Sequence, residues 1–528
     1  MINHRNKYHA ERGLAGVCSC KQVLAVATVL IWNAWRAEAA IHDAASAAES
    51  DVAAAIARAK NGDTVMVPPG VSHWTSILQV TKGITLMGSG TNATTIIDEI
   101  PRIGSYAAFI NAILTPDESF RVSGFTFAPG ASNTNMGDNG FLRIGGICPS
   151  VRVDHCFFNQ LYQVHVVKVF GQLFGVIDHC LFKVRDRTQC ILVWHDGWGG
   201  INHAFGDGSW ADDSYFGSEK FMFIEDNVFD NSQNHRENGG IDCYGGGRMV
   251  VRHNNFINCK PNTHGTESSH RLRGFRAAEI YYNTESMIFQ TSGGQFRGGT
   301  GLIFSNTLTG RFNGETVLTV YREYTTFPPW GAATGFNPWD QNDPHGVYVS
   351  GQHTGTNGSP RLVVVNANWT PNQWIGYTVN NMSAWSDERA KSHQCSGFIQ
   401  VNTSDTITSA LDDSYRKPMT FKTGDKFAIC RVMTALDQCG RGKGALLSGG
   451  DGQSAPTPSR WPVEALDPIY AWGNTLNGMA APIISRYPTV QEGRDYFNDR
   501  AKPGYKPYVY PHPLVTISDG PTNRETLP

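Results

Sequence analysis

The chain has 528 residues, a formal net charge of −2, 17% charged residues, 11% aromatic residues and 56 glycines. This balance excludes a basic nucleic-acid-binding protein and a disordered chain. The length exceeds that of a usual single hydrophobic core, but a repeat protein grows along one axis and escapes this limit.

Residues 1–39 have the pattern of a signal peptide. Basic residues precede an apolar stretch from Val23 to Trp35, and Ala37-Glu38-Ala39 provides small residues for cleavage. The apolar stretch is short for a membrane span. We therefore expect a mature chain without such a span, secreted to the periplasm or outside the cell. Because the basic segment is unusually long, a later start codon and an uncleaved anchor are the alternatives.

An Ala-rich helix is predicted over residues 51–60, where Asn61-Gly62-Asp63 stops it. An amphipathic helix here can close the open end of a solenoid. We therefore expect a capping helix at the N-terminal end of the mature chain.

A short phrase recurs along the chain and indicates a solenoid. Its His or Asn stands at positions 155, 179, 227, 254, 283 and 306, so the steps are 23 to 29 residues with one double step of 48. A short β-branched and aromatic run precedes each copy, and no helical period separates the copies. We therefore predict an all-β fold, a right-handed parallel β-helix over residues 40–310, in which stacked Asn side chains bond to one another and to the turns. Copies include Val153-Asp154-His155-Cys156-Phe157, Ile177-Asp178-His179-Cys180-Leu181, Arg252-His253-Asn254-Asn255-Phe256 and Ala471-Trp472-Gly473-Asn474-Thr475.

Cysteine usage favours thiols over a disulfide framework. Of the 11 cysteines, Cys18 and Cys20 belong to the predicted signal, which leaves an odd number in the mature chain. Cys156 and Cys180 occupy the same place in neighbouring copies, and we expect packed thiols there, with a bridge as the alternative.

The regular coils stop after Asn306 and resume near Ile469. Residues 311–460 are therefore predicted to form an inserted domain, and strand-like runs such as residues 361–365 and 426–431 predict a small antiparallel sheet. Residues 461–528 are expected to hold the last coil and an extended tail, rich in Pro and Tyr, that lies along the solenoid or plugs its far end.

The first coils carry a family resemblance. The run from Thr64 to Gly70 and the run from Gly83 to Gly90, which follow the expected capping helix, resemble the opening of the pectin-lyase-like superfamily. The resemblance extends over about residues 45–310 and 461–480 and implies a right-handed β-helix. It says little about activity, because one fold hosts many functions.

The densest polar cluster lies in consecutive coils between residues 242 and 297. Parallel strands repeat every ~4.8 Å, so aligned arginines repel one another unless an anion lies near them. Rows of guanidinium groups also offer planar donors for carboxylates or sulfates. The alternative is a structural ladder of salt bridges with Asp242, Glu267 and Glu279.

These residue types suit β-elimination from a uronate. That reaction needs a base, cations beside the carboxylate and a proton donor for the leaving oxygen. We predict His264 or Arg273 as the base, with Arg271 and Arg276 as the other catalytic groups. His264 is favoured, because Arg is a poor base at its usual pKa.

The same cluster supplies candidate ligands for the substrate and for a metal. A Gly- and Trp-rich loop at residues 194–200 could form a wall of the groove. The predicted substrate-binding residues are Arg248, Arg297, Trp194 and Trp198. Asp242 and Glu267 are predicted to hold Ca²⁺, which binds oxygen ligands.

The segment from His264 to Arg271 distantly resembles the NGGE-x-x-R stretch of the alginate lyase and chondroitinase B group. The resemblance implies a calcium-binding role for Glu267 and a catalytic role for Arg271. His264-Gly265 stands where that group has Asn-Gly, and the lysine expected one coil earlier is absent. The wider stretch from Asp242 to Tyr282 more closely resembles secreted bacterial β-helix proteins of unassigned activity.

We therefore expect a monomeric, secreted lyase that cleaves an acidic, uronate-containing polysaccharide and binds no nucleic acid. A glycoside hydrolase on the same scaffold is one alternative, although it needs two carboxylates facing each other across the sugar. A glycan-binding surface protein or adhesin without catalysis is the other.

Overall fold

The computed structural model describes most of the chain. The described residues are 39–101, 108–131, 137, 140–186, 188–198, 207–265, 273–314, 316–318, 347–375, 377–391, 395–410, 418–431, 437–444, 464–485 and 490–517. The predicted signal peptide therefore lies outside them, apart from Ala39. Among these residues, no helix has the length and apolar character needed to cross a membrane.

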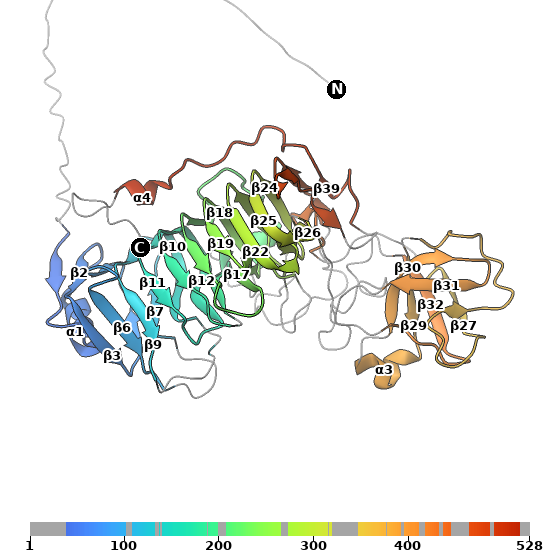
Figure 1. Cartoon of the computed structure of the whole chain (residues 1–528), viewed down its shortest axis with the longest axis horizontal. Coiled ribbons are helices and arrows are strands. Elements are labelled where there is room, and N and C mark those ends of the chain that lie inside the picture. The colour runs from blue at the N-terminus through green and yellow to red at the C-terminus, as the bar shows by residue number, and fades with distance from the viewer. Residues whose placement is uncertain are drawn as a thin grey trace, which may run out of the picture. The chain divides into compact units, whose positions relative to one another are not determined.

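The larger of the two main sheets has 17 parallel strands (Figure 1). Each strand pairs with the equivalent strand of the next coil, so that β15 lies between β12 and β18. The strands are β1 (Ile41–Asp43), β2 (Thr64–Val67), β4 (Leu78–Val80), β5 (Thr85–Gly88), β7 (Ile110–Leu114), β8 (Phe120–Ser123), β10 (Leu142–Asp154), β12 (His165–Asp178), β14 (Gln189–Trp194), β15 (Met222–Glu225), β17 (Asn238–Tyr244), β18 (Arg248–Arg252), β20 (Cys259–Pro261), β21 (Ala277–Tyr281), β24 (Thr300–Phe304), β35 (Ile469–Trp472) and β39 (Tyr496–Phe497).

The second sheet has 11 strands, and all of its pairs are parallel except the last hairpin. It contains β3 (Gly70–Trp74), β6 (Thr94–Asp98), β9 (Thr126–Pro129), β11 (Phe157–Asn159), β13 (Leu181–Lys183), β16 (Val228–Asp230), β19 (Asn255–Ile257), β22 (Thr284–Thr291), β25 (Thr307–Phe312), β36 (Thr475–Leu476) and β37 (Met479–Ala480). Three further parallel strands, β23 (Gly294–Phe296), β26 (Thr316–Leu318) and β38 (Ile484–Ser485), form a short sheet.

Inward side chains of successive coils form continuous apolar rows. Ile177, Ile224 and Val251 occupy one register position and are fully buried. On the second sheet, the rings of Phe182, Phe229 and Phe256 stack in the same way, with centroids 5.0 and 4.7 Å apart. The prediction of an all-β chain with parallel strands is confirmed, and the long parallel sheets are consistent with a β-helix-like solenoid.

Five asparagines form a ladder at one turn of successive coils. The Nδ2 of each donates to the Oδ1 of the next at 3.0 or 3.1 Å. The same Oδ1 accepts the backbone N–H of the preceding asparagine at 3.0 or 3.1 Å. The ladder thus satisfies buried polar groups that strand pairing leaves open. Its members are Asn227, Asn254, Asn283, Asn306 and Asn474.

The register of this turn corrects the repeat count. Asp178 lies opposite Glu225, so His179 aligns with Asp226 rather than with Asn227. The N–H of Cys180 donates to Asn227 Oδ1 at 2.9 Å, which places the buried Cys180 thiol on the ladder. The predicted step of 48 residues from His179 to Asn227 is therefore wrong by one residue, because these two residues occupy different positions of the coil. The residue before each ladder position is in the left-handed region at His155, His179, Asp226, His253, Tyr282 and Ser305, with φ of 48 to 58°.

Helix α1 (Glu49–Arg58) precedes β2 and packs on the first strands. Val52, Ala55 and Ile56 lie in the main hydrophobic cluster, so its apolar side faces the interior. The other helices are short: α2 (Asp207–Ala211), α3 (Glu388–Lys391), α4 (Pro513–Ile517) and the 3₁₀ turn Ala384–Ser386.

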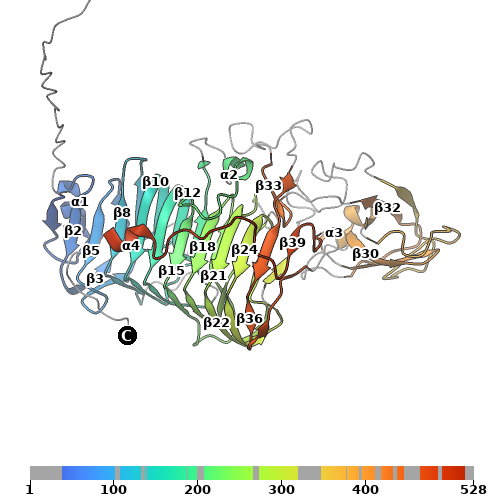
Figure 2. The same ribbon diagram turned by 90° about the horizontal axis from the view of Figure 1, so that it is seen from above.

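The C-terminal strap, residues 499–517, crosses the outward side of the larger sheet from β39 to α4 (Figure 2). Arg252 donates to the carbonyls of Tyr508 and Val509, both at 2.8 Å. Arg152 donates to the Leu514 carbonyl at 3.0 Å. Aromatic and aliphatic side chains of the strap pack against a second hydrophobic cluster on this side of the sheet.

A six-stranded antiparallel sheet interrupts the coils. It has a hydrophobic core of its own, which includes Trp369 and Trp374. Parallel pairing continues to Leu318 and resumes at Ile469, so the interruption begins later than the expected residue 311. Its strands are β27 (Val349–Gln352), β28 (Leu362–Val363), β29 (Tyr377–Asn381), β30 (Ser396–Asn402), β31 (Thr406–Ala410) and β32 (Lys426–Arg431), and a two-stranded ladder of β33 (Arg441–Gly442) and β34 (Ala465–Leu466) follows.

Candidate functional site

A carboxylate between two imidazoles forms the centre of the candidate site. His264 Nδ1 lies 2.5 Å from Asp242 Oδ1, and His165 Nε2 lies 3.6 Å from Asp242 Oδ2. Asp242 is on β17 and His165 begins β12, while the N–H of His264 donates to the carbonyl of Cys243 at 2.9 Å. Parallel stacking therefore brings residues from separate coils to one point, as the sequence predicted for Asp242 and His264.

The carboxylate of this group is enclosed, and one imidazole reaches the surface. The side chain of Asp242 is 1% exposed and that of His264 is 17% exposed. Asp242 Oδ1 also accepts the N–H of Cys243 at 2.9 Å, which fixes the carboxylate. Because Nδ1 of His264 faces Asp242, the tautomer with its proton on Nδ1 presents the lone pair of Nε2. Such an Asp–His pair can act as a general base.

Aromatic and basic side chains surround the pair on the outward side of the sheet. The Tyr244 ring meets the His264 ring edge to face, with centroids 6.3 Å apart, and Trp194 lies 5.9 Å from Tyr244. Arg297 is partly exposed, and its guanidinium donates to Gln295 Oε1 at 2.6 Å. Trp194, predicted to bind substrate, therefore lies near Tyr244 and His264. The N–H of Arg297, also predicted to bind substrate, donates to Oγ1 of Thr263, the residue before His264, at 3.2 Å.

Arg273 does not reach this surface. Its side chain is fully buried, and its guanidinium lies 2.9 Å from Asp437 and 3.6 Å from Glu464. Burial, with the charge of Asp437, raises the pKa of Glu464 well above its ordinary value. A group without exposed area cannot take a proton from a polymer, so the expectation that Arg273 is a base is corrected to a structural role.

Arg276 and Arg248 are also fully buried. Arg276 pairs with Asp467 at 3.1 Å and donates to the Asp212 carbonyl at 2.8 Å. Burial lowers the pKa of Arg248 well below its ordinary value, and its guanidinium donates to Ser209 Oγ and to the Ser209 carbonyl at 2.8 and 2.7 Å. Both arginines hold the segment around α2 against the coils, which corrects their expected catalytic and substrate-binding roles.

Trp198 belongs to the same internal packing. It is 4% exposed, and Arg248 lies 4.4 Å above its ring. Its Nε1 donates to Asp212 Oδ2 at 3.0 Å. The expectation that Trp198 binds substrate is therefore also corrected.

Glu267 and Arg271 lie outside the described residues, so their predicted roles remain predictions. In the described part of the chain, no three His, Cys, Asp or Glu side chains are arranged to hold a metal ion. Calcium takes six to eight oxygen ligands. Asp242 Oδ1 accepts from an imidazole and from a backbone N–H, and Oδ2 lies 3.6 Å from His165 Nε2. Because Glu267, the other predicted ligand, lies outside the described residues, the calcium site remains a prediction.

Two members of the site escaped the sequence analysis. His165 begins β12 and Tyr244 ends β17. The alternation at the end of β17, where Ile241 and Cys243 are in the core, gives Tyr244 an outward side chain. The spacing of the coils would have placed Tyr244 beside Trp194, because these two residues pair in register.

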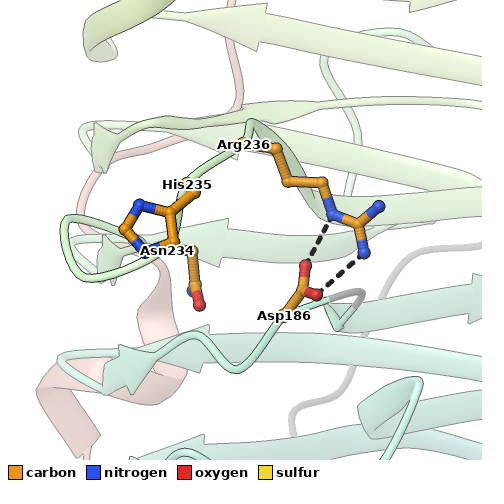
Figure 3. Close-up of a pocket in the computed structure, with 4 residues that line it drawn as sticks. All are labelled: Asp186, Asn234, His235 and Arg236. Carbon is orange, nitrogen blue, oxygen red and sulfur yellow. Dashed lines mark hydrogen bonds and ion pairs between the residues drawn. The ribbon is translucent and has the colours of Figure 1, made fainter.

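A shallow depression lies elsewhere, at the turns before β14 and β17. It is lined by Asp186, Asn234, His235 and Arg236 (Figure 3). Arg236 Nε donates to Asp186 at 2.6 Å, and both side chains are about half exposed, at 48 and 54%. An exposed pair of this kind neutralises itself and contributes little, so the depression carries no ligand-binding argument.

No protein-family model matches the chain, and no curated protein matches it significantly.

Proposed function

We propose that the protein is a secreted lyase that cleaves an acidic, uronate-containing polysaccharide by β-elimination at the Asp242 and His264 site. One observation carries the proposal: His264 Nδ1 lies 2.5 Å from the enclosed Asp242 carboxylate on a side of the sheet that also bears aromatic and basic residues. Oriented imidazoles of this kind serve as bases near neutral pH.

The reaction follows from the acidity of the proton next to the uronate carboxylate. His264 Nε2 takes that proton from C5, and the electron pair left behind forms the C4–C5 double bond. The bond from C4 to the bridging oxygen breaks, and this oxygen takes up a proton. Tyr244, whose ring lies next to His264, carries a phenol that can supply it. Arg297 is the cation that faces the carboxylate as negative charge develops.

The scaffold of the proposal is a right-handed parallel β-helix of the pectin-lyase-like type, closed by α1. The C-terminal strap covers the outward side of β15, β18 and β21. The proposed polymer lies instead along β12, β14 and β17, where Trp194 and Tyr244 are partly exposed. Secretion of a monomer gives it access to polysaccharides outside the cell. No step of the reaction passes through a calcium ion.

The test is the absorbance of unsaturated uronate during incubation with alginate, pectate, glucuronan and chondroitin, with and without a chelator. We expect product from at least one of them. His264→Ala and Asp242→Asn should lower kcat by roughly 10²- to 10⁴-fold, because each removes or misorients the base. His73→Ala is the matched control, since His73 is 62% exposed and lies on β3 of the other sheet.

Other products would select another function. New reducing ends without the double bond would indicate a glycoside hydrolase. Binding to glycans without any cleavage would indicate a glycan-binding surface protein. Either result would overturn the lyase proposal.

A further inference from the structure

Three aromatic residues on adjacent strands lead away from His264 along the solenoid. Phe170 on β12 pairs in register with Trp194 on β14, and Trp194 pairs with Tyr244 on β17. Their neighbours Val169, Val193 and Cys243 are in the core. Because side chains alternate along a strand, the three aromatic rings face outward. We call Phe170, Trp194 and Tyr244 the aromatic row.

Two basic side chains accompany the aromatic row. The guanidinium of Arg143 lies 4.0 Å from the centroid of the Phe170 ring, and Lys168 Nζ lies 5.1 Å from that of Trp194. Arg143 and Lys168 are themselves paired in register on β10 and β12. Arg143 and Lys168 therefore lie over the Phe170 and Trp194 rings, so positive charge and partly exposed aromatic surface lie together along the row.

The backbone makes room for this arrangement. A Cβ at Gly145, which pairs with Phe170, would lie 2.0 Å from Cζ of the Phe170 ring. The ring therefore lies over a position that only glycine leaves clear. Phe170, Trp194 and Tyr244 all remain partly exposed.

Polar atoms beside the row have unused hydrogen-bonding capacity. Arg143 Nη1 donates to Asn111 Oδ1 at 3.0 Å, but its buried Nε has no partner among the described residues. The same holds for Oδ1 of Asp196, which follows β14. Burial raises the pKa of this carboxyl above its ordinary value. Packing alone does not explain a buried guanidinium nitrogen without a partner.

We infer that the aromatic row, with Arg143 and Lys168, binds about two consecutive sugars of an acidic polysaccharide chain that lies parallel to the solenoid axis. Three coils spaced by ~4.8 Å give the row a length of about 10 Å from Phe170 to Tyr244, comparable to that of two sugar residues. Flat rings suit pyranose faces, and guanidinium groups suit uronate carboxylates. The inference rests on the proposed function, because it assigns the part of the substrate that extends from His264 toward the N-terminal coils.

Binding to the full chain carrying His264→Ala tests this, because that protein cannot cleave the ligand by the proposed route. Titration calorimetry with oligouronates from disaccharide to hexasaccharide should show affinity that rises with length. Phe170→Ala and Trp194→Ala should each weaken binding of the longer oligouronates by about three- to tenfold. Gly145→Val, which displaces the Phe170 ring, should act in the same direction. Arg143→Gln should reduce the preference for acidic over neutral oligosaccharides of equal length.

The control is Ile288→Ala, because Ile288 is 61% exposed and lies on β22 of the other sheet. Phe170→Leu keeps an apolar side chain and serves if Phe170→Ala fails to fold. Unchanged affinity in the folded Phe170 and Trp194 variants, equal affinity for neutral oligosaccharides, or no binding of any acidic oligosaccharide would overturn the inference. Binding through the row without elimination by the parent protein would overturn the lyase proposal alone, and elimination that is indifferent to the row would overturn the inference alone.

Discussion

The phenol of Tyr505 donates a hydrogen bond to Glu279 Oε2 and so ties the C-terminal strap to strand β21, 226 residues earlier in the chain. The other oxygen of Glu279 accepts the N–H of Gly217 at 2.7 Å. One buried carboxylate therefore joins three separate segments. The alternative interpretation of the sequence placed Glu279 in a ladder of salt bridges, whereas its carboxylate accepts hydrogen bonds from Tyr505 of the strap and from Gly217.

Replacing Tyr505 by Phe tests this link. The change removes the hydroxyl and leaves a buried carboxylate oxygen without its donor, so we expect the free energy of unfolding to fall by about 1 to 3 kcal/mol. Urea unfolding measures the effect. Tyr508→Phe is the matched control, because the Tyr508 ring packs against Phe223 with centroids 5.2 Å apart and the hydroxyl has no bond to the described residues. Equal losses in the two variants would contradict a specific role of the Tyr505 hydroxyl.

The free energy of unfolding should depend on pH through the protonation of Glu279. Burial raises its pKa to about 7 from an ordinary value of 4.5, against the opposing effects of Tyr505 and Arg252. The folded protein therefore holds a proton that the unfolded chain releases. The stabilisation linked to this proton is complete below about pH 4.5 and is lost as the pH rises through 7, a change on the order of 3 kcal/mol. We expect Glu279→Gln to flatten this part of the profile in urea unfolding between pH 5 and 8. Parallel profiles for the two proteins would refute the assignment.

The asparagine ladder should be most sensitive in its interior. Asn254 Nδ2 donates to Asn283 Oδ1 and to the Ile224 carbonyl, and its Oδ1 accepts from Asn227. Asn254→Ala leaves several buried polar groups without hydrogen-bond partners. We therefore expect the free energy of unfolding to fall by about 3 kcal/mol or more. Asn313→Ala, at an exposed residue with one side-chain hydrogen bond from Gln290, should change stability by at most about 0.5 kcal/mol. Chemical unfolding of the two variants makes the comparison, and similar values would show that the ladder contributes little.

Arg273 offers a test that separates structure from catalysis. Arg273→Met leaves the fully buried Asp437 without its counter-ion, which should cost about 3 to 5 kcal/mol. Adding Asp437→Asn removes the stranded charge and keeps a residue that tolerates the left-handed backbone at this position, where φ is 55°, so the double variant should recover much of the stability measured in urea. We expect the double variant to keep the elimination activity of the parent. A stable double variant without activity would instead mean that Arg273 contacts the substrate.

Much of the fold could be predicted because local turn chemistry repeats with the coils. The asparagines at positions 254 and 283 indicate the ladder, because a side-chain amide can both donate a hydrogen bond to one stacked neighbour and accept one from the other. His179 misled the count, because a left-handed turn residue can be His, Asp, Tyr or Ser, as Asp226 and Tyr282 show. The type of a residue therefore does not by itself give its position in the coil.

The candidate site was predicted in part for the same reason. Asp242 and His264 lie in adjacent coils, so sequence separation alone brought them together. Arg273 has its partner Asp437 at a separation of 164 residues, across the inserted domain, and no periodicity reports such a contact. The sequence shows in which coils charged residues are concentrated, but it does not show which of their side chains are exposed to solvent.

The C-terminal strap matches the number of stacked coils that it crosses. Repeat proteins commonly evolve by duplication or loss of one unit, since each unit contacts only its neighbours. Here Tyr505, Tyr508, His512 and Leu514 engage coils in reverse order of the chain, from β21 to β10. Removing or adding one coil between them would shift every later contact by ~4.8 Å. The length of the C-terminal strap is therefore matched to the number of these coils, and a change in the number of coils requires a matching change in the length of the strap.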